Sequence, residues 1–261
     1  MLTTPMNYMT LLVTLLFLAS CAHDTQNYGH SAPRQVYEGR GIHNAQYVTN
    51  HTASTLPPIK VRDQHKVNDL YKTTRTKVQI LSRYSKARTR KAMTPRYITI
   101  HSTQNTSVTA DAYQHAAALS NGSLGRKSWH YTIDEDRCIQ HIPSYEQGNH
   151  AENYKGGTGN IYSLGLEMCE NKGNSRSRTI DRTARLTAYL MHKHGIPINN
   201  VVPHYHWKRK SRTQPHKDCP HFLLDNGRPG RKWYAFQRLV DSYYQQGFTY
   251  KPATLAYNSG Q

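Results

Sequence analysis

Acidic side chains are scarce in this chain, which has 16 Asp and Glu residues against 34 Lys and Arg among its 261 residues. The formal net charge of +18 predicts attraction to a polyanion such as nucleic acid, anionic lipid or an anionic cell-wall polymer. Apolar residues are also few, at 36%, and the mean hydropathy is −0.79. Values this low argue against a chain that is globular throughout, and they predict that part of it is tail or linker.

Long hydrophobic runs are absent except for residues 11–18, which are too few for a comfortable membrane span. We interpret residues 1–20 as a signal peptide, which takes no part in the fold. The small residues Ala19 and Ser20 before Cys21 resemble a bacterial lipobox, which implies lipidation of Cys21 and a membrane anchor. No aspartate follows Cys21, so the resemblance favours the outer membrane, facing the periplasm. The alternative is an ordinary secretory signal with an incidental cysteine.

Cysteine is rare as well, since beyond Cys21 the chain has only Cys138, Cys169 and Cys219. An odd number in an exported protein leaves at least one thiol unpaired. Metal ligation would explain an unpaired Cys219. Cys138 and Cys169 could form a disulfide or be buried as small apolar residues, and we favour burial because both fall in strand-like runs.

The composition divides the chain into four segments. After the signal peptide, residues 21–92 are predicted to be a linker and a basic extension, with a short basic helix around residues 67–84. Twelve Lys and Arg residues and only two acids lie between residues 60 and 96. Residues 93–246 are predicted to form the compact domain, and residues 247–261 a polar tail.

Apolar periodicity predicts how this domain is built. We expect a hairpin at residues 128–142 around the acidic turn 134–136, strands at 96–100, 162–169 and 201–203, and helices at 108–120, 181–194 and 232–245. The helix at 181–194 would be capped by Thr179 or Asp181 and stopped by Gly195. The interleaving predicts an α/β fold, a single domain with a central mixed β-sheet flanked by helices, behind an unstructured N-terminal extension.

Metal-capable side chains stand at the ends of two apolar runs. His101 ends the first, His204 ends the second, and Cys219 follows a short distance on. Two imidazoles and one thiolate form a three-ligand set that leaves the fourth position of zinc open for water. Between these runs, residues 163–168 form a strand-like segment with a single carboxylate, Glu167. A metal, a base and an open position together indicate a hydrolase.

Several of these segments, in this order, resemble the zinc-dependent N-acetylmuramoyl-L-alanine amidases of the type shared by phage lysozyme-amidases and peptidoglycan recognition proteins. The resemblance covers residues 95 to 225. The matching pieces are ITIHST (98–103), SWHYTID (128–134), GNHA (148–151), SLGLE (163–167), VPHYHW (202–207) and KDCP (217–220). Each piece alone is a weak signal, and their order and spacing together are a strong one.

The resemblance implies one zinc ion per chain, held by His101, His204 and Cys219. His204 is favoured over His206 because the family's ligand directly follows the short strand. Glu167 maps onto the general base, and Lys217 maps onto a lysine that stabilises charge on the tetrahedral intermediate. For both residues the alternative is a charged side chain with no catalytic role.

Trp129, His130 and His150 fall where relatives place groove residues, so the resemblance implies contact with substrate, and ordinary packing is the alternative. The implied function is hydrolysis of the amide between N-acetylmuramic acid and L-alanine of the stem peptide. The implied partners are peptidoglycan or muropeptides, and the membrane through a lipid on Cys21. The alternative is a non-catalytic peptidoglycan-binding module of the same fold. A nucleic-acid partner is not expected, because no recognisable binding motif accompanies the charge.

Overall fold

In this computed structural model, residues 57–152 and 156–253 are described. The predicted signal peptide, Cys21, most of the linker and the end of the tail lie outside those residues. The helices and strands are β1 (Ile59–Arg62), α1 (Gln64–Thr73), β2 (Thr76–Val78), β3 (Tyr97–Ser102), α2 (Ala112–Ser120), β4 (Tyr131–Ile133), β5 (Cys138–Gln140), α3 (Thr158–Tyr162), β6 (Ser163–Met168), α4 (Arg176–His194), η1 (Ile198–Asn200), β7 (Val201–Pro203), η2 (His204–His206), η3 (His221–Leu223), α5 (Arg231–Gln246) and β8 (Phe248–Lys251).

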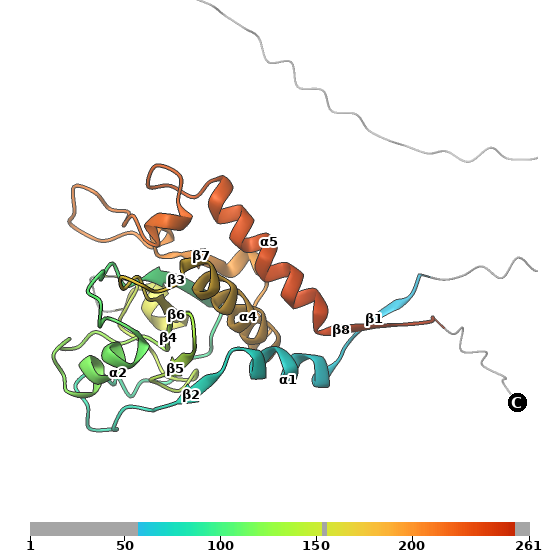
Figure 1. Ribbon diagram of the computed structural model, residues 1–261, viewed down its shortest axis with the longest axis horizontal. Helices are drawn as coiled ribbons and strands as arrows, with labels where there is room; N and C mark the ends of the chain where they lie inside the picture. Colours follow the sequence, from blue (N-terminus) through green and yellow to red (C-terminus); the bar gives the residue numbers. More distant parts are fainter. Residues whose placement is uncertain (1–56, 153–155, 254–261) are drawn as a thin grey trace, which may run out of the picture. The chain divides into compact units, whose positions relative to one another are not determined.

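Six strands form the central sheet, in the order β2-β5-β4-β6-β3-β7. The β4–β5 pair is antiparallel and the other neighbours are parallel, so the sheet is mixed. The predicted α/β fold with a mixed central sheet flanked by helices is therefore confirmed. Figure 1 shows α4 and α5 beside the sheet and α2 near β4 and β5.

The apolar core lies on one face of the sheet. Ile98 and Ile100 of β3 belong to one buried cluster with Leu186 and Leu190 of α4 and with Phe236 of α5. Because side chains alternate along a strand, the residues that alternate with Ile98 and Ile100 on β3, which include His101, project from the other face. The packing of α4 and α5 thus leaves the opposite face of β3 and β6 for the polar residues of the site.

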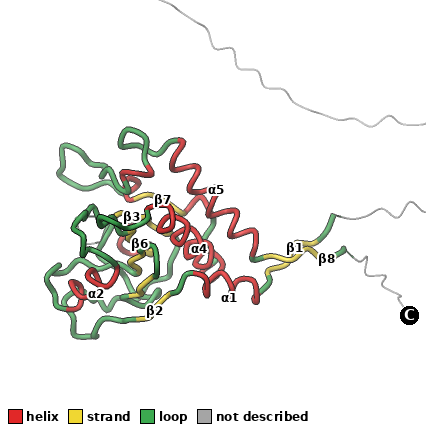
Figure 2. The backbone as a smooth tube through the Cα atoms, in the orientation of Figure 1, coloured by secondary structure: helices red, strands yellow, loops and turns green. Residues whose placement is uncertain are grey.

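Part of the predicted basic extension is folded. The segment contains β1, α1 and β2 (Figure 2), and β2 pairs in parallel with β5. Leu81 and Ala87 are buried in one cluster with Trp129, and Arg88 forms an ion pair with the carboxylate of Glu146. The boundary at residue 92 stays a prediction, although residues on both sides of it contribute to one sheet. No helix among the described residues is long and apolar enough to cross a membrane.

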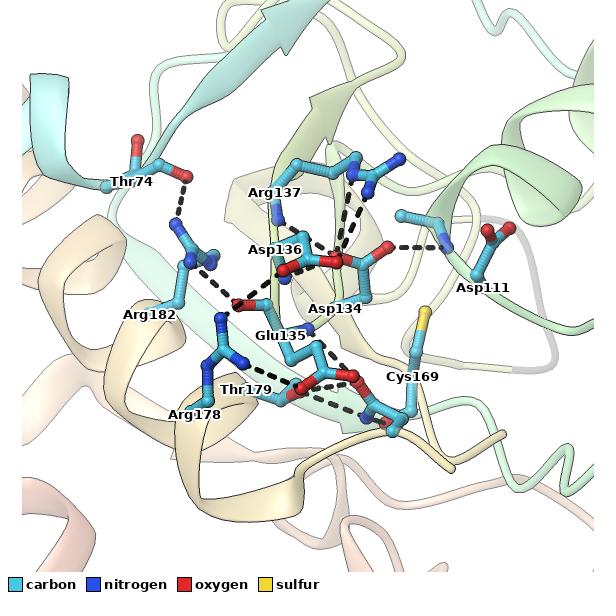
Figure 3. Close-up of polar contacts among 12 residues, drawn as sticks. Thr74, Asp111, Asp134, Glu135, Asp136, Arg137, Cys169, Arg178, Thr179 and Arg182 are labelled. Atoms are coloured by element: carbon cyan, nitrogen blue, oxygen red, sulfur yellow. Dashed lines mark hydrogen bonds and ion pairs between the residues drawn. The ribbon is translucent and has the colours of Figure 1, made fainter. Parts of the chain in front are cut away.

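The acidic turn of the predicted hairpin is fixed by two arginines of α4 (Figure 3). Arg182 donates to the carbonyl oxygens of Glu135 and Thr74, at 2.8 and 2.9 Å, and so ties α4 to both the turn and the end of α1. Arg178 forms ion pairs with the carboxylates of Glu135 and Asp136. These contacts hold the β4–β5 end of the sheet against α4.

The helix α4 begins earlier than the sequence pattern predicts. The N-cap is Ser175, whose side chain accepts a hydrogen bond from the backbone N–H of Arg178, so the prediction of Thr179 or Asp181 as cap is wrong. The helix ends where expected, at Gly195 with φ 65°. The last strand, β8, lies in the predicted polar tail and pairs with β1.

Candidate metal centre

Three buried donor side chains meet at the carboxyl ends of β3 and β7. His101 is the fifth residue of β3, and His204 directly follows β7, which pairs with β3 in parallel. Cys219 comes from the loop that precedes η3. One ligand atom from each of the three residues lies within 4.8 Å of the others, and the two Nδ1 atoms of His101 and His204 are 2.8 Å apart.

Two of the donors are held from outside by another group. Nε2 of His101 lies 2.9 Å from Nδ1 of His150. The backbone N–H of Ser102 donates to Sγ of Cys219 at 3.3 Å. The outer nitrogen of His101 is therefore occupied, and its Nδ1 faces Nδ1 of His204.

Burial sets the protonation of this cluster. It lowers the pKa of His101, and it lowers the pKa of His204 to about 3, with the nearby charge of Lys217 acting in the same direction on both. Both rings are thus neutral, which is the form that binds a metal. Burial raises the pKa of the Cys219 thiol to about 12, and the carboxylate of Glu167 adds to the effect. A coordinated metal ion deprotonates such a thiol.

The carboxyl group of Glu167 lies beside these donors. Glu167 is the register partner of His101 on β6, and its Oε1 lies 3.8 Å from Nδ1 of that histidine. Its side chain is only 15% exposed, and its buried Oε2 has no hydrogen-bond partner among the described residues. Burial raises the pKa of Glu167 to about 7, against the opposing charge of Lys217. A carboxyl group with a free oxygen and a near-neutral pKa is suited to taking up a proton at this site.

The charge of Lys217 reaches every member of the cluster. It lowers the pKa of His101, His204, Glu167 and Cys219. Lys217 is half-buried and lies two residues before Cys219 in the same loop. The structure therefore brings together His101, His204, Cys219 and Glu167, and it places Lys217 where its charge acts on all four.

The three residues expected to contact substrate have internal partners instead. Trp129 is buried and donates from Nε1 to Oγ1 of Thr132 at 2.7 Å. Nδ1 of the buried His130 accepts from the backbone N–H of Gly165, and its Nε2 donates to the carbonyl oxygen of Glu146. His150 contacts His101, as described above. Substrate contact by these residues stays a prediction, and the polar atoms of their rings are already engaged within the protein.

His206 lies apart from the three donors. Residues 204–206 form the short helix η2, not an extended segment, and the ring of His206 lies against Trp207 and Tyr97. The exposed His206 is not in the donor cluster, whereas His204 is. Cys138 and Cys169 are buried and unpaired, as favoured from the sequence.

Two residues that position the site were missed from the sequence. Oδ1 of Asn160 accepts hydrogen bonds from the backbone N–H groups of His150 and Ala151, both at 2.8 Å. Gly165 leaves room for the ring of His150, because a Cβ at this position would lie 2.7 Å from Cγ of that ring. An asparagine and a glycine carry no chemical signal of their own, so only the fold shows these contacts.

Known proteins share this domain. The family described as N-acetylmuramoyl-L-alanine amidase (Amidase_2) matches residues 91–222. The amidase CwlH of Bacillus subtilis (strain 168) is 41% identical over 151 residues, which cover 58% of this chain and 55% of that protein. The amidase XlyA of the same strain is 42% identical over 134 residues, which cover 51% and 42%. The chain thus spans about half the length of the curated relatives it matches.

Solved structures agree with these matches. The catalytic domain of XlyA superposes with a TM-score of 0.55 at 36% identity, covering 63% of this chain and 98% of that one. A mutant endolysin from Bacillus subtilis gives a TM-score of 0.56 at 36% identity, and the match covers 63% of this chain and 97% of the endolysin chain. The family match at residues 91–222 includes β3, β6 and β7, the strands at which the donor cluster lies.

An α/β domain with two histidines, one cysteine and a buried glutamate at the ends of its strands is the arrangement expected of a metal-dependent hydrolase. The matching residues 91–222 contain all five of the clustered side chains. This chain belongs to the N-acetylmuramoyl-L-alanine amidase family.

Proposed function

We propose that this protein is a zinc-dependent N-acetylmuramoyl-L-alanine amidase, which hydrolyses the amide between N-acetylmuramic acid and L-alanine in peptidoglycan. The observation that carries the proposal is the cluster of His101, His204 and Cys219 with Glu167 beside it. Membership of the amidase family supports the same reaction.

The donor set fits a single zinc ion. Nε2 of His101 is taken up by its contact with His150, which leaves Nδ1 of His101 facing Nδ1 of His204 at 2.8 Å. Two ring nitrogens and a thiol that converge in this way are suited to sharing a cation. Nitrogen and sulfur donors favour zinc, and three protein ligands are typical of catalytic zinc sites. When bound, zinc lowers the pKa of a water molecule toward 7 and polarises a carbonyl group.

The side chains around the centre supply the remaining functions. Glu167 takes the proton from the attacking water and passes it to the leaving amine, because its free Oε2 and its pKa of about 7 allow it to accept and release a proton. The ammonium group of Lys217 stabilises the negative charge that develops on the carbonyl oxygen of the substrate. His101, His204 and Cys219 hold the metal, and their burial keeps competing water away.

Mass spectrometry of digested peptidoglycan tests the proposal. The domain should release stem peptides with a free L-alanine amino group, and treatment with a chelator should stop the release. Zinc added back to the chelated protein should restore it. If the zinc-loaded protein binds peptidoglycan but does not cleave it, the protein is a recognition module and not an enzyme.

The place of action is a separate part of the proposal. The lipobox-like sequence before Cys21 supports a signal peptide, lipidation and an outer-membrane anchor facing the periplasm, with residues 21–92 reaching from the anchor to an amidase domain at 93–246. The Cys21→Ser protein should incorporate no labelled fatty acid and should be either unprocessed or soluble in the periplasm. Lipid labelling that persists in this variant contradicts the anchor and leaves the enzymatic proposal untouched.

A further inference from the structure

His150 connects His101, a candidate metal ligand, to the protein backbone. One of its ring nitrogens contacts His101 and the other contacts a backbone carbonyl group. Its Nδ1 lies 2.9 Å from Nε2 of His101, and its Nε2 lies 3.1 Å from the carbonyl oxygen of Ser163. His150 belongs to the GNHA segment. The planes of the His101 and His150 rings are inclined at 83°, so the edge of one ring meets the face of the other. The histidine therefore lies between the donor cluster and the first residue of β6.

These two contacts determine where the protons lie. A carbonyl oxygen can only accept a hydrogen bond, so Nε2 of His150 carries a proton and donates it to Ser163. A neutral imidazole has one proton, and Nδ1 of His150 is then an acceptor. It follows that Nε2 of His101 is the donor in the contact between the two rings. The remaining nitrogen of His101, Nδ1, keeps its lone pair, and this is the atom that faces His204 and Cys219.

The fold keeps the ring of His150 in this position. Cβ atoms built at Gly148 and Gly165 would both lie 2.7 Å from the ring, so the absence of a side chain at both positions makes space for it. The side chain of Asn160 accepts from the backbone N–H groups of His150 and Ala151 and fixes the main chain on which the ring stands.

We propose that His150 is a positioning residue of the metal centre, which fixes the tautomer and orientation of His101 by accepting its Nε2 proton, and that it does not act by contacting substrate. The proposal rests on the zinc site proposed above. Partners of this kind raise the basicity of a ligating histidine, and their removal typically weakens metal binding by about 10- to 100-fold. Here the partner is a second imidazole, which is itself anchored by a backbone carbonyl group.

Two variants separate this role from a substrate contact. His150→Phe keeps a ring of similar size and removes the acceptor, so zinc affinity in a competition titration should fall about 10- to 100-fold. His150→Asn places an amide oxygen near the position of Nδ1, so it should recover most of the affinity. The exposed His206→Phe substitution is the matched control and should leave zinc affinity unchanged. A residue that only binds substrate would give the opposite pattern, with a raised KM and unaltered zinc affinity.

A measurement on the unaltered protein decides the question even where a variant does not fold. In zinc-loaded protein, ¹⁵N NMR of the histidine side chains should show a proton on Nε2 of His101 and, for His150, a proton on Nε2 and none on Nδ1. A proton on Nδ1 of His150 would overturn the proposal, because that atom could then not accept a hydrogen bond from His101. The zinc titration of the unaltered protein keeps the two proposals distinct. Absence of a zinc site refutes the proposed function, whereas a tight site that His150→Phe leaves intact refutes only the role of His150.

Discussion

Glu167 and His101 are register partners on the neighbouring strands β6 and β3, and Oε1 of the glutamate lies 3.8 Å from Nδ1 of the histidine. Side chains of register partners project from the same face of a sheet, so the sheet itself sets the distance between the carboxylate and the donor cluster. A strand is a more rigid support than a loop, and a proton acceptor must be held within hydrogen-bond reach of the reacting water. The pairing of β3 with β6 is thus part of the proposed catalytic arrangement.

The Glu167→Gln substitution should separate metal binding from turnover. The amide keeps the shape of the side chain but cannot take up a proton, so we expect turnover to fall by about 10²- to 10⁴-fold. Zinc should stay bound, because Glu167 is not one of the three donors. Glu135→Gln is the control, since this glutamate pairs with Arg178 and lies outside the cluster. A normal rate for Glu167→Gln would assign the residue a structural role only.

Cys219→Ala should lose zinc and activity together. Metal analysis of the unaltered protein should give about one zinc per chain, as expected for a single site with three protein ligands. Removal of the sulfur leaves two donors, and we expect the variant to elute metal-free. Cys169→Ala is a suitable control, because this cysteine is equally buried and unpaired but lies outside the donor cluster. Retention of stoichiometric zinc by Cys219→Ala would rule out the proposed ligand set.

The Lys217→Met substitution should affect the chemical step more than binding. The charge of Lys217 acts on Glu167 and on both histidine donors. Loss of a single group that stabilises an oxyanion typically costs about 3 kcal/mol, or roughly 10²-fold in kcat. We expect a fall of this size in kcat with little change in KM, measured on a soluble muropeptide. Lys208→Met, which removes an exposed charge from the same loop, should have no such effect. Equal losses in both variants would point to the general charge of the loop.

The metal-free protein should lose stability as the pH falls below about 6.5, the ordinary pKa of histidine. Burial lowers the pKa of His141 to about 3, so between these two values the unfolded chain binds a proton that the folded chain does not. The free energy of unfolding therefore rises with pH in this window, by about 1.4 kcal/mol per unit for one such group. Denaturant titrations at several pH values should show a shallower dependence for His141→Gln. The exposed His65→Gln substitution should leave the slope as it is.

The sequence predicted the strands that carry the site better than the segments that surround it. β3, β6 and β7 are apolar runs, and at or just after the carboxyl end of each stands a residue that can bind a metal or take up a proton. The sequence pattern therefore indicates both the strand and its functional residue. β1 and β8 were missed, because they are short and largely exposed and they pair Ile59 with Lys251, far apart in the chain. The start of α4 was missed because its first residues, Arg176 and Ser177, show no apolar period.

The role of His150 could not be predicted in the same way. Its ring fits only because Gly165 lies opposite, and its partner His101 is 49 residues away in the sequence. The GNHA segment singles out His150 among the sixteen histidines only as a residue of the substrate groove, and nothing in the sequence indicates its contact with His101. Contacts of this kind depend on the three-dimensional placement of β3 against β6, which local patterns do not encode.

The basic segment offers a test of surface attraction that is independent of catalysis. The segment was predicted to be a basic extension outside the compact domain, but Leu81 and Ala87 are buried in it, so deletion of residues up to 92 would also disturb packing. Its exposed cations, which line an open cavity of about 450 Å³, can be changed without such damage. Lys86 and Lys91 are two of them.

We expect the double variant Lys86→Gln and Lys91→Gln to bind insoluble peptidoglycan less tightly at low salt. Attraction between surface charges weakens beyond the Debye length, which is about 10 Å at 0.1 M salt and 3 Å at 1 M, so the difference from the unaltered protein should vanish at high salt. Removal of two exposed charges from α5, by Arg231→Gln and Arg238→Gln, controls for net charge alone. A local basic surface predicts that only the first pair weakens binding in a sedimentation assay. Equal weakening by both pairs would mean that overall charge, and not this surface, concentrates the protein on the polymer.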